Sequence, residues 1–293
     1  MVMFKNKTTD NTNKDDKGLN YYLDKTKGYK SDYPEFNIKQ VDGFNIIDES
    51  VLGVGAKSRM SDFYISNLKH KELVYVAPRV GYAALSLAHL CKKHNKNLTL
   101  VIPASKEVSD HQALAIEYGA TPLFLRVAGM KNANRAASMY ADATGAHFIP
   151  FGLDTEDVYA GAVTEFQKLR KYNIKRLWCV ISTGVLSRSL QIALPDTEIF
   201  NVAVARNIQQ GELGRAHFQS YHKGFTSKAD TIPPFDSVLT YDAKGWEYLK
   251  EHGQEGDWFF NVAGPAPLPT ISKELIHSYR DWNDNSDFGN ILD

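Results

Sequence analysis

A lysine stands at the expected start of a helix, in the segment Gly53-Val54-Gly55-Ala56-Lys57-Ser58-Arg59-Met60. The glycines before it allow the backbone to approach a ligand closely. Cations are disfavoured at helix N-termini, so Lys57 either points into water or has a depressed pKa that helps its amine act as a nucleophile. A nucleophilic amine forms Schiff bases with carbonyl compounds, and both readings of Lys57 stay open at this point.

A turn rich in hydroxyl groups is the second candidate for chemistry. Ser182-Thr183-Gly184 follows the apolar run Leu177-Trp178-Cys179-Val180-Ile181 and precedes the expected helix that begins near Leu186. Hydroxyl and backbone N–H groups at such a turn can hold a phosphate dianion, because the helix dipole favours negative charge there. The same residues are equally typical of a plain helix N-cap.

The rest of the chain must position these two segments. Short β-rich runs alternate with longer helical stretches from residue 73 onward, which predicts an α/β fold with parallel-rich sheets flanked by helices. Strands are expected at 73–77, 98–102, 122–127, 147–151, 177–182, 199–205 and 258–262, and helices near 59–70, 81–95, 107–118, 132–143, 155–172, 186–193 and 242–252. Ligands bind beyond the carboxyl ends of parallel strands, so the strand-to-helix turns are the places where a site is expected.

Composition limits the class of protein. A chain of 293 residues with 43% apolar and 23% charged residues suits a globular enzyme, and we expect two lobes that meet at a cleft. Lys plus Arg balance Asp plus Glu at 34 each, so no global field attracts nucleic acid, although a local basic patch stays open. The sequence has no apolar run long enough to span a bilayer and no secretion signal, and we expect a cytoplasmic protein.

Two features carry less chemistry. Residues 1–33 are rich in polar residues without a clear period and are expected to form a mobile N-terminal arm, although its tyrosines suggest that part of it docks on the body. Cys91 and Cys179 have no metal-site spacing and are expected to be small buried hydrophobes, and the sequence predicts no metal site.

Several motifs in order, between residues 53 and 268, carry a resemblance to a known family. They are Gly55-Ala56-Lys57-Ser58-Arg59-Met60, Phe148-Ile149-Pro150-Phe151-Gly152, Trp178-Cys179-Val180-Ile181-Ser182-Thr183-Gly184-Val185-Leu186, Tyr241-Asp242-Ala243-Lys244-Gly245 and Phe259-Phe260-Asn261-Val262-Ala263-Gly264-Pro265. Together they resemble the fold-type II pyridoxal-phosphate enzymes of the tryptophan synthase β superfamily. The most similar branch contains 1-aminocyclopropane-1-carboxylate deaminase and D-cysteine desulfhydrase.

The resemblance implies a cofactor, pyridoxal 5'-phosphate, held as an internal aldimine by Lys57. It implies that residues 182–186 (Ser182, Thr183, Gly184, Val185 and Leu186) hold the phosphate, that Asn261 lies beside the pyridine nitrogen, and that Tyr241 is an active-site acid or base. The larger cofactor-binding lobe would comprise residues 34–59 and 153–293, and the smaller α/β lobe residues 60–152, with the cofactor between them. A homodimer is also what the resemblance suggests.

The match fails at one turn that faces the substrate in the family. Where the family branch has a Ser-Asn pair after the first small-lobe strand, this chain reads Arg79-Val80-Gly81-Tyr82. We therefore assign Arg79, Gly81 and Tyr82 to substrate binding, with Arg79 available to pair with a carboxylate or phosphate.

The reaction stays open between three alternatives. The resemblance favours a lyase or deaminase that acts on an amino acid or an amino-acyl group, with Lys57 as the base after substrate replaces it. The lost serine favours a decarboxylase of a bulkier amino-acyl substrate. A degenerate member that keeps the fold and serves as a binding subunit is the third alternative.

Two groups of residues near the motifs are expected to have ordinary roles. Lys244 matches a lysine of the family, but a solvated helix lysine is the default expectation. His217, Tyr221 and His222 have no clear family match and lie in a stretch where substrate specificity would be set.

Overall fold

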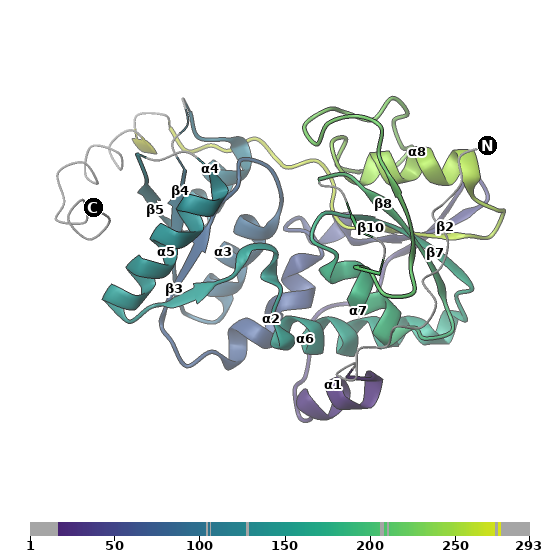
Figure 1. Ribbon diagram of the computed structural model, residues 1–293, viewed down its shortest axis with the longest axis horizontal. Helices are drawn as coiled ribbons and strands as arrows, with labels where there is room; N and C mark the ends of the chain where they lie inside the picture. The colour runs from purple at the N-terminus through teal and green to yellow at the C-terminus, as the bar shows by residue number, and fades with distance from the viewer. Residues whose placement is uncertain are drawn as a thin grey trace. The chain divides into compact units, whose positions relative to one another are not determined.

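The computed structural model describes residues 17–103, 105, 107–126, 129–205, 208–209, 211–272 and 275–276. The chain divides into two compact units (Figure 1). The first unit comprises residues 1–63 and 156–265, and the second comprises residues 64–155 and 266–293. The residues after Pro265 are thus grouped with the second unit, whereas the sequence had suggested one large lobe from residue 153 to the end.

The first unit is built on a six-stranded sheet in the order β1-β2-β10-β7-β8-β9. The strands are β1 (Ile38–Val41), β2 (Phe44–Asp48), β7 (Arg176–Ile181), β8 (Glu198–Ala203), β9 (His217–Ser220) and β10 (Trp258–Asn261). Among these described strands the β1–β2 hairpin is antiparallel, and the other four pairings are parallel. This confirms the expected parallel-rich α/β class, while β1, β2 and β9 were not predicted.

Helices cover both faces of this sheet (Figure 1). Side chains alternate between faces along a strand. One face, with Trp178, Val180 and Phe200, packs on α8 (Asp242–His252) through Trp246 and Leu249. The opposite face packs on α7 (Val185–Ala193), which is in turn covered by α6 (Glu156–Phe166). The sheet edge at the carboxyl ends of β7 and β10 therefore lies where α7 and α8 begin.

The start of the chain docks on the first unit. Helix α1 (Leu19–Lys25) packs on α6, where Lys25 forms ion pairs with Glu156 and Asp157. Tyr22 is buried, and the Tyr29 hydroxyl donates a hydrogen bond to the Asp62 carboxylate over 2.5 Å. Residues 17–33 of the expected mobile arm are therefore held against the body, because these aromatic rings find apolar and acidic partners there. Residues 1–16 lie outside the described part of the chain.

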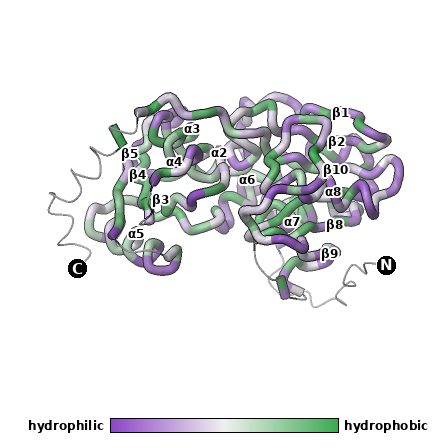
Figure 2. The backbone as a smooth tube through the Cα atoms, turned by 90° about the horizontal axis from the view of Figure 1, so that it is seen from above, coloured by the Kyte–Doolittle hydropathy of each residue, from purple (hydrophilic) through white to green (hydrophobic). Residues whose placement is uncertain are grey.

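The second unit contains an all-parallel sheet in the order β5-β4-β3-β6. Its strands are β3 (Glu72–Val76), β4 (Asn97–Ile102), β5 (Thr121–Phe124) and β6 (His147–Ile149), and they are apolar along most of their length (Figure 2). The helices are α3 (Ala83–Lys93), α4 (Asp110–Glu117) and α5 (Met130–Thr144). Alanines of α5 pack on Val74, Val76 and Val101 on one face of the sheet. All four strands of this unit were predicted, to within three residues at either end.

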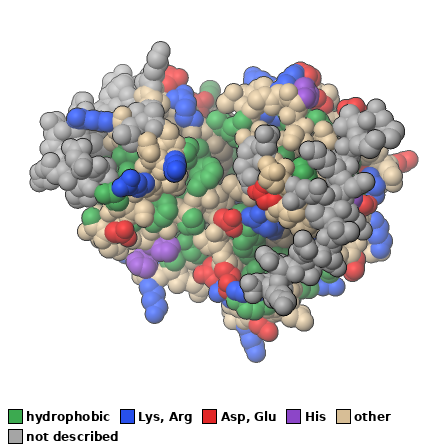
Figure 3. Space-filling model, in the orientation of Figure 1, with side chains coloured by type: hydrophobic (Ala, Val, Ile, Leu, Met, Phe, Trp, Pro, Cys, Tyr) green, Lys and Arg blue, Asp and Glu red, His purple; other side chains and the backbone are tan. Residues whose placement is uncertain are grey.

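The surface agrees with the balanced composition. On the face in Figure 3, basic and acidic side chains are interspersed rather than gathered by sign. Among the described residues, no helix combines the length and the apolar character needed to cross a membrane.

Candidate functional site

Lys57 is the first residue of helix α2 (Lys57–Asn67) and lies in the first unit. The loop before it is tied to the end of β10, because the amide of Ala56 donates to the carbonyl of Val262 over 2.8 Å. The buried Ser58 hydroxyl closes the turn by donating to the carbonyl of Gly55 over 2.8 Å. Lys57 is half-buried, and burial lowers the pKa of its amine. The structure therefore places a lysine that loses its proton more readily than usual beside the carboxyl end of a parallel strand.

Arg59 fixes the start of α2 from the side away from solvent. Its guanidinium is buried and donates two hydrogen bonds to the Glu49 carboxylate, over 2.7 and 3.0 Å. A third bond, of 3.0 Å, reaches the Glu165 carboxylate in α6, and the ring of Phe36 lies 4.3 Å from the guanidinium carbon. Two-point bonding between arginine and carboxylate restricts geometry as well as distance. These contacts hold the backbone two residues after Lys57 in one position.

A buried carboxylate faces Lys57, and sequence reasoning missed it. Asp242 is the first residue of α8 and is fully buried, and its charge interacts with that of Lys57. Burial raises its pKa well above the usual value, although the nearby amides of Val262 and Ala263 favour the charged form. Neither carboxylate oxygen has a hydrogen-bond partner of good geometry. A carboxylate at a helix N-terminus looks like an ordinary favourable residue in a sequence, so only burial identifies this one as a site residue.

Tyr241 precedes Asp242 and caps α8 without a side-chain hydrogen bond to it. Its hydroxyl donates to the carbonyl of Val180 over 3.3 Å. Burial raises the pKa of this hydroxyl, and the neighbouring Ser182 only partly opposes the effect. Tyr241 therefore stays protonated at neutral pH and lies between the Ser182 turn and the start of α8.

Asn261, at the end of β10, is held firmly by one end of its amide. Its nitrogen donates to the Asp48 carboxylate over 2.9 Å and to the carbonyl of Asp236 over 2.8 Å. Its side-chain oxygen is buried without a hydrogen-bond partner, as is the hydroxyl of Ser237. A buried polar atom without a partner costs about 1–3 kcal/mol. Together with Asp242, these atoms form a set of unsatisfied polar groups around the end of β10 and the start of α8, which fits a bound polar molecule.

The predicted phosphate turn has the geometry of an anion site. Gly184 adopts a left-handed conformation, with φ of 87°, at the N-cap of α7, and no side chain caps that helix. A Cβ added to Gly184 would lie 2.8 Å from Leu213 Cδ2 and 3.2 Å from Arg188 Nη1, so the turn admits only glycine. Ser182 and Thr183 are half-buried beside it, and Val185 and Leu186 form the first turn of α7. The nearby Ser187 hydroxyl instead bonds Asn201 and Gln191.

The three predicted substrate residues lie in the second unit. Arg79 and Gly81 follow β3, and Tyr82 is the N-cap residue of α3. Gly81 has a φ of 119°, which only glycine adopts readily. Arg79 donates to the carbonyl of Glu107 over 2.9 Å and is half exposed. Their assignment to substrate binding remains a prediction.

Lys244 is not solvated, and the default expectation for it was wrong. Its side chain is fully buried, and its ammonium donates to the carbonyls of Gly224 and Phe225 over 3.0 and 2.9 Å. The ring of Tyr221 lies 4.9 Å from the same ammonium. The loop that supplies these acceptors comes about twenty residues earlier in the chain, so helix periodicity alone could not indicate it. Lys244 fastens this loop to α8.

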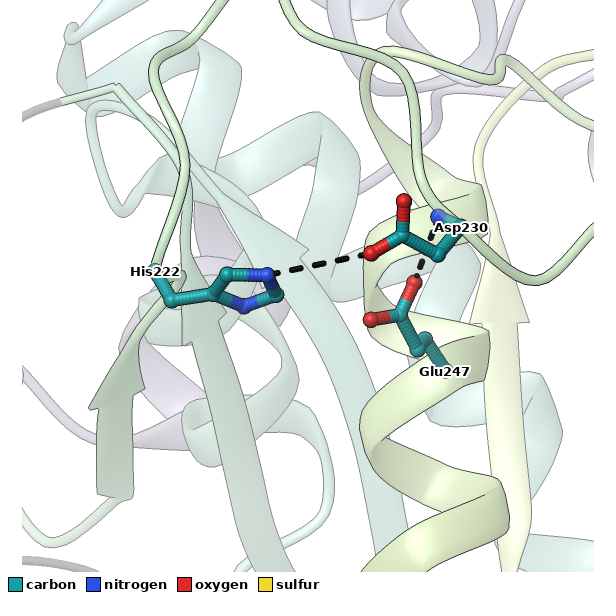
Figure 4. Close-up of side chains that lie close together, drawn as sticks. All are labelled: His222, Asp230 and Glu247. Carbon is teal, nitrogen blue, oxygen red and sulfur yellow. Dashed lines mark hydrogen bonds and ion pairs between the residues drawn. The ribbon is translucent and has the colours of Figure 1, made fainter.

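A cluster of metal-ligand types occurs at the other end of this loop. His222, Asp230 and Glu247 lie close together at the surface (Figure 4). Glu247 already accepts hydrogen bonds from the amides of Asp230 and Thr231, and Asp230 forms an ion pair with Lys223. Because these groups satisfy one another, the cluster is explained as the second fastening of the loop to α8.

Comparisons with known proteins bear on the fold. No family model matches the sequence, and no curated protein matches it. Solved structures do match. A structure described as an ACC deaminase homologue aligns over 90% of this chain and 98% of its own, with a TM-score of 0.69 and 14% identity. A threonine deaminase whose source is given as T.th. aligns over 85% and 98%, with a TM-score of 0.65 and 18% identity.

A pyridoxal 5'-phosphate-dependent aspartate racemase aligns over 87% of this chain and 95% of its own, with a TM-score of 0.61 and 12% identity. At these identities the likeness shows a shared fold. Two α/β units with parallel-rich sheets, a lysine at the start of α2 and matches that span most of both chains together establish that this chain has the fold of the fold-type II pyridoxal-phosphate enzymes.

Proposed function

We propose that this protein is a pyridoxal-phosphate-dependent lyase or deaminase that acts on an amino acid or an amino-acyl group. The observation that carries the proposal is the pairing of Lys57 with Asp242 within this fold. A half-buried amine with a lowered pKa interacts with a fully buried carboxylate that has no hydrogen-bond partner. Such a pair is expensive to keep in a folded protein unless a ligand completes it, because buried charges need partners.

The residues present fit pyridoxal 5'-phosphate. Lys57 would hold it covalently through its amine, and residues 182–186 would hold its phosphate at the N-terminus of α7. Asp242 and the free amide oxygen of Asn261 would face the polar edge of its ring, where each could accept a hydrogen bond. When bound, the cofactor supplies an electron sink that weakens the bonds at the substrate's Cα.

The protein's own groups supply the proton transfers. Because burial lowers the pKa of Lys57, a larger share of its amine is unprotonated at neutral pH, and its Nζ can accept a proton. Because burial raises the pKa of Tyr241, its hydroxyl keeps its proton and acts as a donor instead of a base. We assign Lys57 as the base and Tyr241 as the acid.

Arg79, Gly81 and Tyr82 are proposed to contact the substrate. The ion pair of Arg79 with Glu107 is long, at 3.8 Å, and exposed, so it contributes little and leaves the guanidinium able to exchange partners. A carboxylate of the substrate is the group that such an arginine would recognise.

The experiment that tests the proposal is reconstitution of the purified protein with pyridoxal 5'-phosphate. We expect visible absorbance from the wild type, which borohydride reduction makes permanent, and a modified peptide that contains Lys57 by mass spectrometry. Lys57→Ala should abolish the covalent adduct, whereas Lys175→Ala, at an exposed lysine of the same unit, should leave it unchanged. A wild-type protein that stays colourless would remove the proposal and favour a binding subunit without cofactor.

Product analysis separates the remaining reactions. Released ammonia and a keto acid would support the lyase or deaminase assignment, whereas released carbon dioxide would support the decarboxylase. A homodimer and a cytoplasmic location are further proposals, and light scattering of the purified protein tests the first.

A further inference from the structure

Arg188 lies against the phosphate turn, although neither its type nor its position was singled out in the sequence. It belongs to the first turns of α7, four residues after Gly184. Its Nη1 is 3.2 Å from the point where a side chain at Gly184 would begin, and its Nη2 donates to the carbonyl of Thr183 over 3.4 Å. Side chains on a helix lean toward its N-terminus, so an arginine at this position covers the turn before the helix.

A second residue holds the guanidinium in place. The Arg188 Nε donates to the hydroxyl of Tyr159 in α6 over 2.7 Å, and its guanidinium carbon lies 5.6 Å from the centre of the same ring. Tyr159 in turn packs on the ring of Tyr22 in α1, with 6.4 Å between centroids. The arginine is thus oriented by a rigid aromatic side chain instead of moving freely in solvent.

The charge at this turn calls for a cation. A phosphate monoester carries a charge of about −1.5 to −2 near neutral pH. The N-terminus of a helix offers the equivalent of roughly half a positive charge. Arg188 is the one basic residue between Ser182 and Leu190, so no other residue of the turn or the first helix turns could supply the remainder. Guanidinium matches phosphate geometry with two parallel hydrogen bonds.

We propose that Arg188 binds the phosphate group of the cofactor and that Tyr159 positions it there. The inference rests on the proposed function, since it assumes that pyridoxal 5'-phosphate is the ligand. It assigns the charge recognition to a side chain at the fourth position of the helix, in addition to the backbone amides at its start.

The test compares two ligands that differ only in the phosphate. Dissociation constants of pyridoxal 5'-phosphate and of pyridoxal are measured by absorbance titration for the full-length wild type, Arg188→Met, Arg188→Lys and Tyr159→Phe. Loss of a charge-assisted hydrogen bond weakens binding roughly 10- to 100-fold. We expect Arg188→Met to weaken binding of the phosphorylated ligand by that amount and to leave pyridoxal binding within about twofold.

The other variants and a spectroscopic signal complete the design. Arg188→Lys should recover part of the affinity, and Tyr159→Phe, which removes only the hydroxyl, should give a smaller loss of the same selectivity. The phosphorus-31 resonance of the bound cofactor should shift in Arg188→Met. Equal weakening of both ligands would make Arg188 a structural residue, and unchanged affinities would overturn the inference while the proposed function stands. Failure of the wild type to bind either ligand would overturn both.

Discussion

Asp242 offers a prediction in which one substitution changes two properties in opposite directions. Asp242→Asn keeps the size of the side chain but cannot ionise. The carboxyl is fully buried, both its oxygens lack hydrogen-bond partners, and its pKa is raised by burial. A raised pKa means that the folded protein binds the proton more tightly than the unfolded chain does, so the wild type without cofactor loses stability as pH rises above about 4.

The magnitude follows from these contacts. Each tenfold difference in proton affinity between folded and unfolded states corresponds to about 1.4 kcal/mol, and a buried polar group without partners costs about 1–3 kcal/mol. We therefore expect Asp242→Asn to resemble the wild type near pH 4 and to be more stable by on the order of 1–3 kcal/mol near pH 8, in the absence of cofactor. With cofactor the sign reverses, and the affinity for pyridoxal 5'-phosphate should fall roughly 10- to 100-fold.

Urea unfolding at several pH values and absorbance titration measure the two halves. Asp257→Asn is the matched control, because the Asp257 carboxylate is also buried but accepts hydrogen bonds from Arg176, Trp178 and Gln254. This control should lose stability without a gain at high pH. If Asp242→Asn were also destabilising at every pH and left cofactor affinity unchanged, Asp242 would be a structural residue and the reasoning would fail.

Three further predictions concern the support of the site. Arg59→Met leaves two buried carboxylates unpaired and should lower the free energy of unfolding by about 3–5 kcal/mol in urea, and a loss below about 1 kcal/mol would contradict the role given to it. Gly245→Ala places a Cβ 2.4 Å from a methyl group of β7 and should cost about 1–3 kcal/mol, whereas Gly224→Ala, with open space, should cost much less. Ion pairing lowers the pKa of Glu156 to about 2, so the docking of α1 should persist above pH 4.5 and weaken as pH falls toward 2 or as salt rises. Limited proteolysis near residue 25 measures this, and cleavage independent of pH and salt would refute it.

The parallel framework could be predicted from the sequence because buried parallel strands are nearly continuous apolar runs. The β1–β2 hairpin was missed, since Lys39 and Gln40 make its edge strand half polar. Its signal was present in Asp42-Gly43, whose positive φ values of 50° and 84° are those of a two-residue hairpin turn.

The site was only partly predictable. Lys57 and the Ser182 turn were found because their residue types at strand and helix ends carry chemical meaning. Asp242, Lys244 and Arg188 were missed, because the first two depend on burial and the third on which way a helix side chain leans. Each is an ordinary surface residue in a helical pattern until tertiary contacts enclose it.

The pairing of β2 with β10 has a consequence for synthesis of the protein. Asn45 lies opposite Trp258, so the sheet that carries Lys57 cannot close until the segment around Trp258 has left the ribosome. The four strands of the second unit, in contrast, all come from residues 72–149 and can pair as soon as that stretch emerges. Contacts between distant parts of a chain form slowly. During translation the half that carries Lys57 is therefore the last to mature, and its exposed apolar strands depend on that delay being short.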